Sequence, residues 1–86
     1  MATRVFRTRR GRITLTDEAL IYEQIRDPHV RVSVARADIT EVRIVTYAHW
    51  LMPVRIDVLI HHRRGLLTIP RVGRRTAEAL RVALGF

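Results

Sequence analysis

Apolar and polar residues alternate along most of the chain. Alternation with a period of two is typical of a β-strand, because successive side chains point to opposite faces. In residues 30–36 valine occupies every second position up to Val34, and residues 54–63 alternate over a longer stretch. Residues 12–16 and 42–44 continue the pattern, and β-branched residues, which half-buried strands prefer, are frequent in these runs. The pattern therefore predicts a mainly β chain up to about residue 70.

Turn-forming residues separate these runs. Arg10-Gly11, Asp27-Pro28-His29, Pro53 and Arg64-Gly65 are all typical of turns or strand ends. Placed between these breaks, the predicted strands span about residues 4–9, 12–16, 20–26, 31–36, 41–48, 54–62 and 66–70.

A helical pattern is confined to the C-terminus. Between about residues 73 and 84 the apolar residues fall on one helical stripe, made of Ala77, Leu80, Ala83 and Leu84. With 86 residues the chain is long enough for one modest core, so we expect a single domain over residues 1–86.

Residues 16–26 allow two interpretations. Thr16-Asp17-Glu18 followed by apolar residues has the composition of a helix start, with a hydroxyl cap and two acids in the first turn. The same residues can form a tight turn between two strands, with Asp17 bonding its own backbone. Because strand patterns flank this segment at intervals of about 8–12 residues, we favour the turn.

The apolar phase of each run also predicts the core. These residues occupy the face of their strand or helix that is consistently apolar, and we expect them to be buried: Ile13, Leu15, Leu20, Val34, Ile39, Val42, Ile44, Ile56, Val58, Ile60, Leu80 and Leu84.

Four segments resemble a known family when they are taken in order. Residues 11–22 (GRITLTDEALIY) are similar to the G-x-L-x-L-T-D-x-x-L-x-F signature of pleckstrin-homology-like (PH-like) domains, especially the GRAM and bacterial PH groups. Residues 32–34 and 38–42 resemble their I-P-L-x-D-I-x-x-V segment, residues 55–69 their penultimate hairpin, and residues 74–84 their closing helix. The resemblance covers nearly the whole chain.

This resemblance implies a fold and a type of function. The fold would be mainly β, a PH-like partly open barrel of seven strands in two sheets, capped by one C-terminal α-helix. The amphipathic stripe that carries Leu80 and Leu84 would cover the end of the barrel. The function implied is that of a non-enzymatic binding or scaffolding module.

Charge narrows the choice of partners. Sixteen basic residues against eight acids give a net charge of +8, and all sixteen are arginine, which is typical of a GC-rich bacterial genome. A net positive charge of this size favours anionic partners, although a solvated surface without a partner would have the same composition.

The chain has no cysteine, no apolar run of about 20 residues, and no apolar segment like that of a signal peptide at its start. We expect a cytoplasmic protein that can lie at the membrane periphery.

Arginines gather in two parts of the sequence. An N-terminal block contains Arg4, Arg7, Arg9, Arg10 and Arg12, and a second cluster contains Arg63, Arg64, Arg71, Arg74 and Arg75. Guanidinium groups bind phosphate with two parallel hydrogen bonds, which makes both clusters candidates for an anion site. The resemblance points to Arg7, Arg10 and Arg12, which are similar to the K-x(n)-[KR]-x-R pattern of lipid-binding PH domains. Because the loop between the first two strands is very short, we favour diffuse attraction to anionic surfaces over a specific pocket, and we rank a solvated face without a partner above both. The candidate residues for binding anions are Arg7, Arg9, Arg10, Arg12, Arg63 and Arg64.

Residues 47–53 form an unusually apolar connection between two predicted strands. The segment contains the only tryptophan of the chain, and we expect its large side chains to form an apolar contact surface made of Tyr47, Trp50, Leu51 and Met52. We rank three roles for this surface. Packing within the fold or contact with a second copy of the chain is favoured most, insertion into a membrane interface is second, and stacking on single-stranded nucleic acid is third.

The residues needed for catalysis are scarce. The chain has one serine, no cysteine, no glycine-rich phosphate loop and no paired carboxylates. His61 and His62 are adjacent on a predicted strand and point to opposite faces, so they do not form a metal site together. We therefore expect no enzyme, no metal, no cofactor and no small-molecule substrate.

The expected function is that of a PH-like module that self-associates and engages a protein partner or an anionic lipid surface. The alternative is a basic nucleic-acid-binding protein with Trp50 and Tyr47 stacked on bases.

Overall fold

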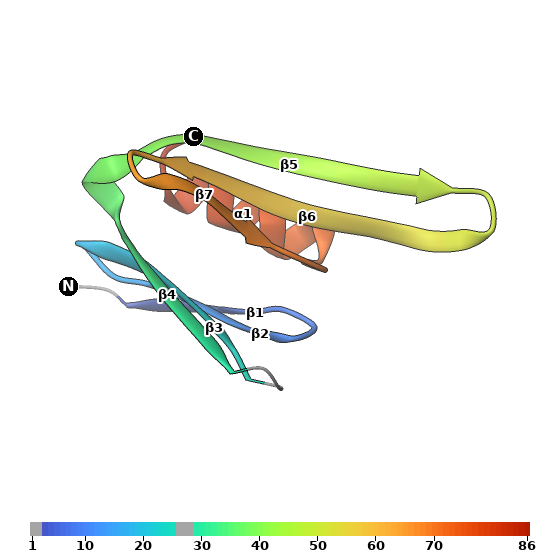
Figure 1. Cartoon of the computed structure of the whole chain (residues 1–86), viewed down its shortest axis with the longest axis horizontal. Coiled ribbons are helices and arrows are strands. Elements are labelled where there is room, and N and C mark those ends of the chain that lie inside the picture. Colours follow the sequence, from blue (N-terminus) through green and yellow to red (C-terminus); the bar gives the residue numbers. More distant parts are fainter. Residues whose placement is uncertain (1–2, 26–28) are drawn as a thin grey trace.

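The computed structural model describes residues 3–25 and 29–86, except for the side chains of His49 and Met52. Within these residues the chain forms two antiparallel sheets and one α-helix (Figure 1). The first sheet has the order β1 (Arg4–Arg7), β2 (Gly11–Leu15), β3 (Ala19–Gln24) and β4 (Val30–Ala35). A short 3-10 turn, η1 (Arg36–Asp38), leads to the second sheet, which has the order β5 (Ile39–His49), β6 (Met52–His62) and β7 (Gly65–Ile69). The chain ends with α1 (Arg74–Ala83).

The predicted fold class is confirmed as mainly β with one C-terminal helix. Each strand lies where the alternation placed it, with its ends shifted by at most two residues, and Arg26, predicted to end the third strand, lies outside the described residues. In the described part of the chain the four-stranded and three-stranded sheets share no strand pairing, so they form two layers and are not closed into a barrel.

The turn interpretation of residues 16–19 is also confirmed. The Thr16 N–H donates to the Ala19 carbonyl at 2.9 Å, which closes the β2–β3 hairpin. The Thr16 hydroxyl oxygen then accepts the N–H groups of Glu18 at 3.3 Å and Ala19 at 3.0 Å. The local side-chain bonds expected from Asp17 are thus made by Thr16, whose shorter hydroxyl arm suits the same geometry.

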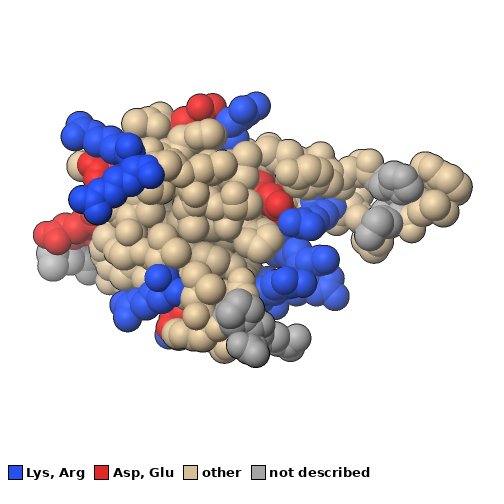
Figure 2. All heavy atoms as spheres, in the orientation of Figure 1, with Lys and Arg blue, Asp and Glu red and all other residues tan. Residues whose placement is uncertain are grey.

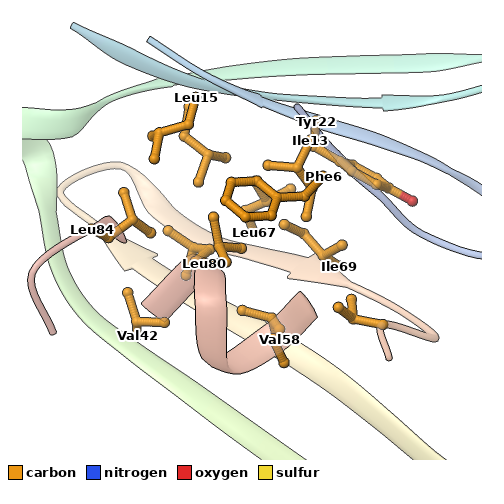
Figure 3. Packing of buried hydrophobic residues seen from close by; sticks show 14 of the residues in the cluster. Phe6, Ile13, Leu15, Tyr22, Val42, Val58, Leu67, Ile69, Leu80 and Leu84 are labelled. Carbon is orange, nitrogen blue, oxygen red and sulfur yellow. The ribbon is translucent and has the colours of Figure 1, made fainter. Parts of the chain in front are cut away.

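The core lies between the two sheets and is closed by α1. Of the twelve predicted core residues, eleven are buried, and Ile44 is half-buried at the margin of the cluster. Leu80 points from α1 into this cluster, and Leu84 lies beside it (Figure 3). The prediction omitted other buried apolar residues, which come from β1, β3, β7, the segment before the helix and α1 itself: Phe6, Tyr22, Leu67, Ile69, Val72 and Ala77.

One arginine ties α1 to the four-stranded sheet. Arg36 in η1 donates from Nη1 to the Thr16 carbonyl at 3.1 Å and from Nη2 to the Ala83 carbonyl at 3.0 Å. The Ala83 carbonyl lies at the C-terminal end of the helix, where a cation is favoured by the helix dipole. The contact fixes the C-terminal end of α1.

The β5–β6 hairpin extends beyond the rest of the molecule (Figure 1). β7 pairs only with residues 58–62 of β6, so the outer half of the hairpin has no third strand. The connection expected over residues 47–53 is therefore corrected: both strands continue through it and close at a turn of Trp50 and Leu51. The extension gives the molecule unequal dimensions of 42 × 28 × 25 Å.

Candidate anion-binding groove and projecting hairpin

An open groove lies along the part of β6 that β7 leaves uncovered. It has a volume of about 720 Å³ and is bounded by the β1–β2 turn, by residues 53–56 of β6 and by the segment that leads into α1. Five arginines line it, and we call it the arginine groove: Arg7, Arg9, Arg55, Arg71 and Arg74. Figure 2 shows basic side chains gathered in the angle where the hairpin leaves the body.

Backbone hydrogen bonds hold the three segments of the groove together. The Arg9 N–H donates to the Arg71 carbonyl at 3.4 Å, which joins the β1–β2 turn to the segment after β7. The Val72 N–H donates to the Ile56 carbonyl at 2.8 Å, which joins that segment to β6. The groove is thus part of the folded framework, although Arg9 and Arg71 are 62 residues apart in the sequence.

Asp57 is the buried anchor of the groove. The residue is 2% exposed, and its carboxylate accepts two hydrogen bonds from the Arg55 guanidinium, each 3.0 Å long, and one from the Arg71 N–H at 3.1 Å. Burial raises the pKa of this carboxyl, but the hydrogen bonds from Arg55 and Arg71 and the charges of both residues outweigh it, so that the pKa is lowered overall. Asp57 is therefore ionised at neutral pH and holds Arg55 in place.

The backbone at Arg71 is in an uncommon conformation. Its φ angle is 54°, in the left-handed region that residues other than glycine seldom adopt. Such a residue persists where its surroundings fix it, at a cost of about 1–3 kcal/mol. Here the fixed points are Asp57, which accepts the Arg71 N–H, and Arg9, which donates to the Arg71 carbonyl. The conformation lets Arg71 line the groove at the bend between β7 and α1.

The electrostatic field in the groove is positive. The arginines that line it are largely exposed, and the carboxylate beside them, Asp57, is already bonded to Arg55. α1 begins at the same place with Arg74, and its first turn has neither an acidic residue nor a side-chain cap on Gly73. The helix dipole therefore adds to the positive charge of the arginines. Chemically, the groove offers guanidinium donors to phosphate or carboxylate groups.

The structure divides the predicted anion-binding residues. Arg7 and Arg9 line the groove, but Arg10 and Arg12 do not. Arg12 lies 2.8 Å from Glu23 on the neighbouring strand, and hydrogen bonds from Arg12 and then from His29 lower the pKa of the Glu23 carboxyl.

Arg63 and Arg64 do not belong to this groove. They form the β6–β7 turn, at the end of the sheet opposite to the start of α1 (Figure 1). Arg63 is eight residues from Arg55 along β6, which at about 3.3 Å per residue is roughly 26 Å. Of the second sequence cluster, only Arg71 and Arg74 therefore lie in the same groove as Arg7 and Arg9 of the N-terminal block.

The six predicted site residues did not include Arg55, nor Arg71 and Arg74 of the second sequence cluster. Arg55 stands on the outward face of an amphipathic strand, where arginine is ordinary. The signal available for it was Asp57 two residues later on the same face, because a carboxylate at that spacing can hold a guanidinium.

The outer part of the hairpin exposes large apolar side chains. Trp50 is 87% exposed and Leu51 67%, and Tyr47 and Val54 are exposed as well. We call these four residues the hairpin tip. The Arg55 guanidinium lies over the Tyr47 ring, 5.7 Å from its centre, so that the tip and the groove adjoin. Met52, also predicted for this surface, has a side chain outside the described residues.

Comparison with known proteins finds no relative of this chain. No family model, curated protein or solved structure matches this chain. In the part of the chain that the structure describes, no three His, Cys, Asp or Glu residues are grouped so as to hold a metal ion. Nor is any helix of that part long and apolar enough to cross a membrane. The groove and the hairpin tip are the features from which function can be argued.

Proposed function

We propose that this protein is a non-enzymatic, PH-like binding module whose arginine groove engages the anionic surface of a membrane. The observation that carries the proposal is the convergence of five arginines from three distant segments on one groove. Chance exposure of arginine would scatter the charges, whereas here the fold collects them, and a buried carboxylate orients one of them.

A surface is a better partner for this groove than an enclosed small molecule. The groove is open, and the β1–β2 turn beside it is tight: the Thr8 N–H bonds the Gly11 carbonyl at 2.9 Å, which leaves no loop to wrap a ligand. Basic residues near an anionic membrane contribute about 1 kcal/mol each. The groove arginines together can therefore hold a 10.0 kDa protein reversibly at such a surface.

The PH-like part of the proposal is supported by the order of the elements. A four-stranded antiparallel sheet, a three-stranded antiparallel sheet and a C-terminal helix follow one another, as the resemblance implies. The helix packs its apolar stripe, including Leu80, into the core between the two sheets. In this arrangement the groove lies at the edge of the second sheet, next to the start of the helix.

A binding panel tests the proposal. The protein is mixed with phosphatidylcholine vesicles, with vesicles that also contain phosphatidylserine, and with short single-stranded DNA and RNA, each over a series of salt concentrations. We expect binding to the phosphatidylserine vesicles that weakens steeply with salt, and no binding to phosphatidylcholine alone. Equal binding to both vesicles would contradict the proposal. Binding to nucleic acid without binding to vesicles would replace it with the alternative, in which Trp50 and Tyr47 stack on bases.

A further inference from the structure

The hairpin tip and the arginine groove are arranged as two zones of one elongated projection. The longest stretch of the sequence without Asp, Glu, Lys or Arg is residues 44–54, and it is the outer part of the β5–β6 hairpin. The next residue, Arg55, begins the groove. On the face that Figure 2 shows, the described part of the projection carries no Lys, Arg, Asp or Glu beyond the cluster at its base.

The apolar residues of the tip do not share a face. Tyr47 is opposite Arg55 in the register of the hairpin, so these two side chains lie on the same face of the ribbon. Val54 precedes Arg55 and therefore belongs to the other face, and Trp50 and Leu51 form the end. A surface that is apolar on both faces and at its end fits an apolar medium that surrounds it better than a partner that covers one face.

The reach of the hairpin is long enough to cross the lipid head-group layer. Leu51 is four residues beyond Arg55, roughly 13 Å at about 3.3 Å per residue. A bilayer of about 40–45 Å with a hydrocarbon core of about 30 Å has a head-group layer of roughly 5–8 Å on each side. With the groove arginines at the phosphates, the tip therefore crosses this layer, and its end lies among the outermost segments of the acyl chains. Tryptophan and tyrosine are enriched at the interface that the hairpin crosses.

We infer that the hairpin tip enters the interfacial layer of an anionic bilayer while the groove arginines contact the lipid phosphates. The inference rests on the proposed function and adds to it the element that enters the membrane and the orientation of the protein. The projection would stand steeply to the membrane plane, with the β1–β2 turn and the beginning of α1 at the head-group level and the rest of the four-stranded sheet on the side of the solution.

A second copy of the chain, the occupant favoured by the sequence, fits the tip less well. Stable interfaces between proteins take about 800 Å² and some 20–30 residues from each partner. The tip consists of four described residues at the end of a two-stranded ribbon, with arginines directly behind it. Two such tips would also bring their arginine grooves close together, and like charges would repel. A lipid surface requires neither a large shaped interface nor a partner of opposite shape.

The fluorescence of the wild-type protein tests the inference without a variant, because Trp50 is the only tryptophan. On addition of vesicles that contain phosphatidylserine we expect its emission to move to shorter wavelength, and lipids brominated on the acyl chain to quench it. Vesicle binding with unchanged emission and no quenching would overturn the inference and leave the proposed function standing. Absence of vesicle binding would overturn both. Shielding of Trp50 that rises with protein concentration in the absence of lipid, together with a dimer in sedimentation, would assign the tip to a second copy.

A pair of variants separates the tip from general surface apolarity. Trp50→Ser with Leu51→Ser should weaken binding to phosphatidylserine vesicles on the order of tenfold, and the residual binding should be more sensitive to salt. The matched control replaces another exposed aromatic and leucine, Phe86→Ser with Leu66→Ser, away from the groove. Circular dichroism establishes that each variant is folded. Equal losses in the two folded variants would contradict a specific role for the tip.

Discussion

Asp57 illustrates how one buried residue organises an exposed surface. Aspartate is seldom fully buried unless it is paired, and here its carboxylate accepts hydrogen bonds from Arg55 and from the Arg71 backbone. These two residues are distant in sequence and adjacent in the groove. The carboxylate also lowers the net charge of the site, so a simple count of charges would treat it as unfavourable for binding an anion. Its role is to fix the positions of the Arg55 guanidinium and of the left-handed backbone at Arg71.

Replacement of Asp57 separates orientation from net charge. Asp57→Asn changes the net charge from +8 to +9, since one acid is lost, and charge alone would then strengthen binding to anionic vesicles. We expect the opposite, roughly fivefold weaker binding, which corresponds to about 1 kcal/mol. Vesicle titration at fixed salt measures the change.

The matched control for this prediction is Asp38→Asn. It makes the same change of charge in η1, next to Arg63 and far from the groove. We expect this variant to bind as tightly as the wild type or more tightly. Stronger binding by both variants would show that net charge governs binding and that the arrangement of the arginines does not.

At the level of elements, β6 connects the core to the candidate site. Its inner half pairs with both β5 and β7 and buries Val58 and Ile60, whereas its outer half carries Arg55 and the exposed Val54. The same alternation of side chains runs through both halves. What changes along the strand is its surroundings: β7 pairs only with residues 58–62, and beyond the buried Ile56 and Asp57 the side chains of residues 53–55 are exposed.

The two halves of β6 should respond differently to the same substitution. Val58→Ala removes methyl groups from a fully buried side chain and should lower the free energy of unfolding by about 1–4 kcal/mol. Val54→Ala, on the same strand but 60% exposed, should change it by less than about 0.5 kcal/mol. Denaturant unfolding of both variants provides the measurement. Equal destabilisation would mean that the hairpin packs against the body.

The elements were largely predictable from the sequence, because alternation and turn residues are local signals. The β2–β3 hairpin and the seven strand positions follow from such signals alone. Only the outer end of the β5–β6 hairpin, residues 47–53, was interpreted as a connection, since Pro53 and the large apolar side chains of this segment interrupt the alternation. Whether such a segment continues as a ribbon depends on cross-strand pairing, such as Tyr47 with Arg55, and pairing is not visible in a single run.

At the level of the whole molecule, the arginine groove depends on tertiary structure. Arg7 and Arg9 were predicted as anion-binding residues, but their neighbours Arg55 and Arg71 reach them only through sheet order and the bend before α1. The sequence brought Arg63 and Arg64 into the same group because they are close to Arg71 along the chain. In the fold a whole strand, β7, separates them from it. Proximity in sequence was therefore a poor guide to which charges act together.

The most direct measurement compares two charge-matched variants in a titration with phosphatidylserine vesicles at fixed salt. Arg7→Gln with Arg74→Gln removes two charges from the groove, and Arg63→Gln with Arg64→Gln removes two from the far turn, so each variant has a net charge of +8 − 2 = +6. At about 1 kcal/mol per arginine, the groove variant should bind roughly thirtyfold more weakly than the wild type. The far-turn variant should remain within about threefold of it. Equal losses in both variants would contradict a specific groove and leave only the diffuse attraction of a basic protein.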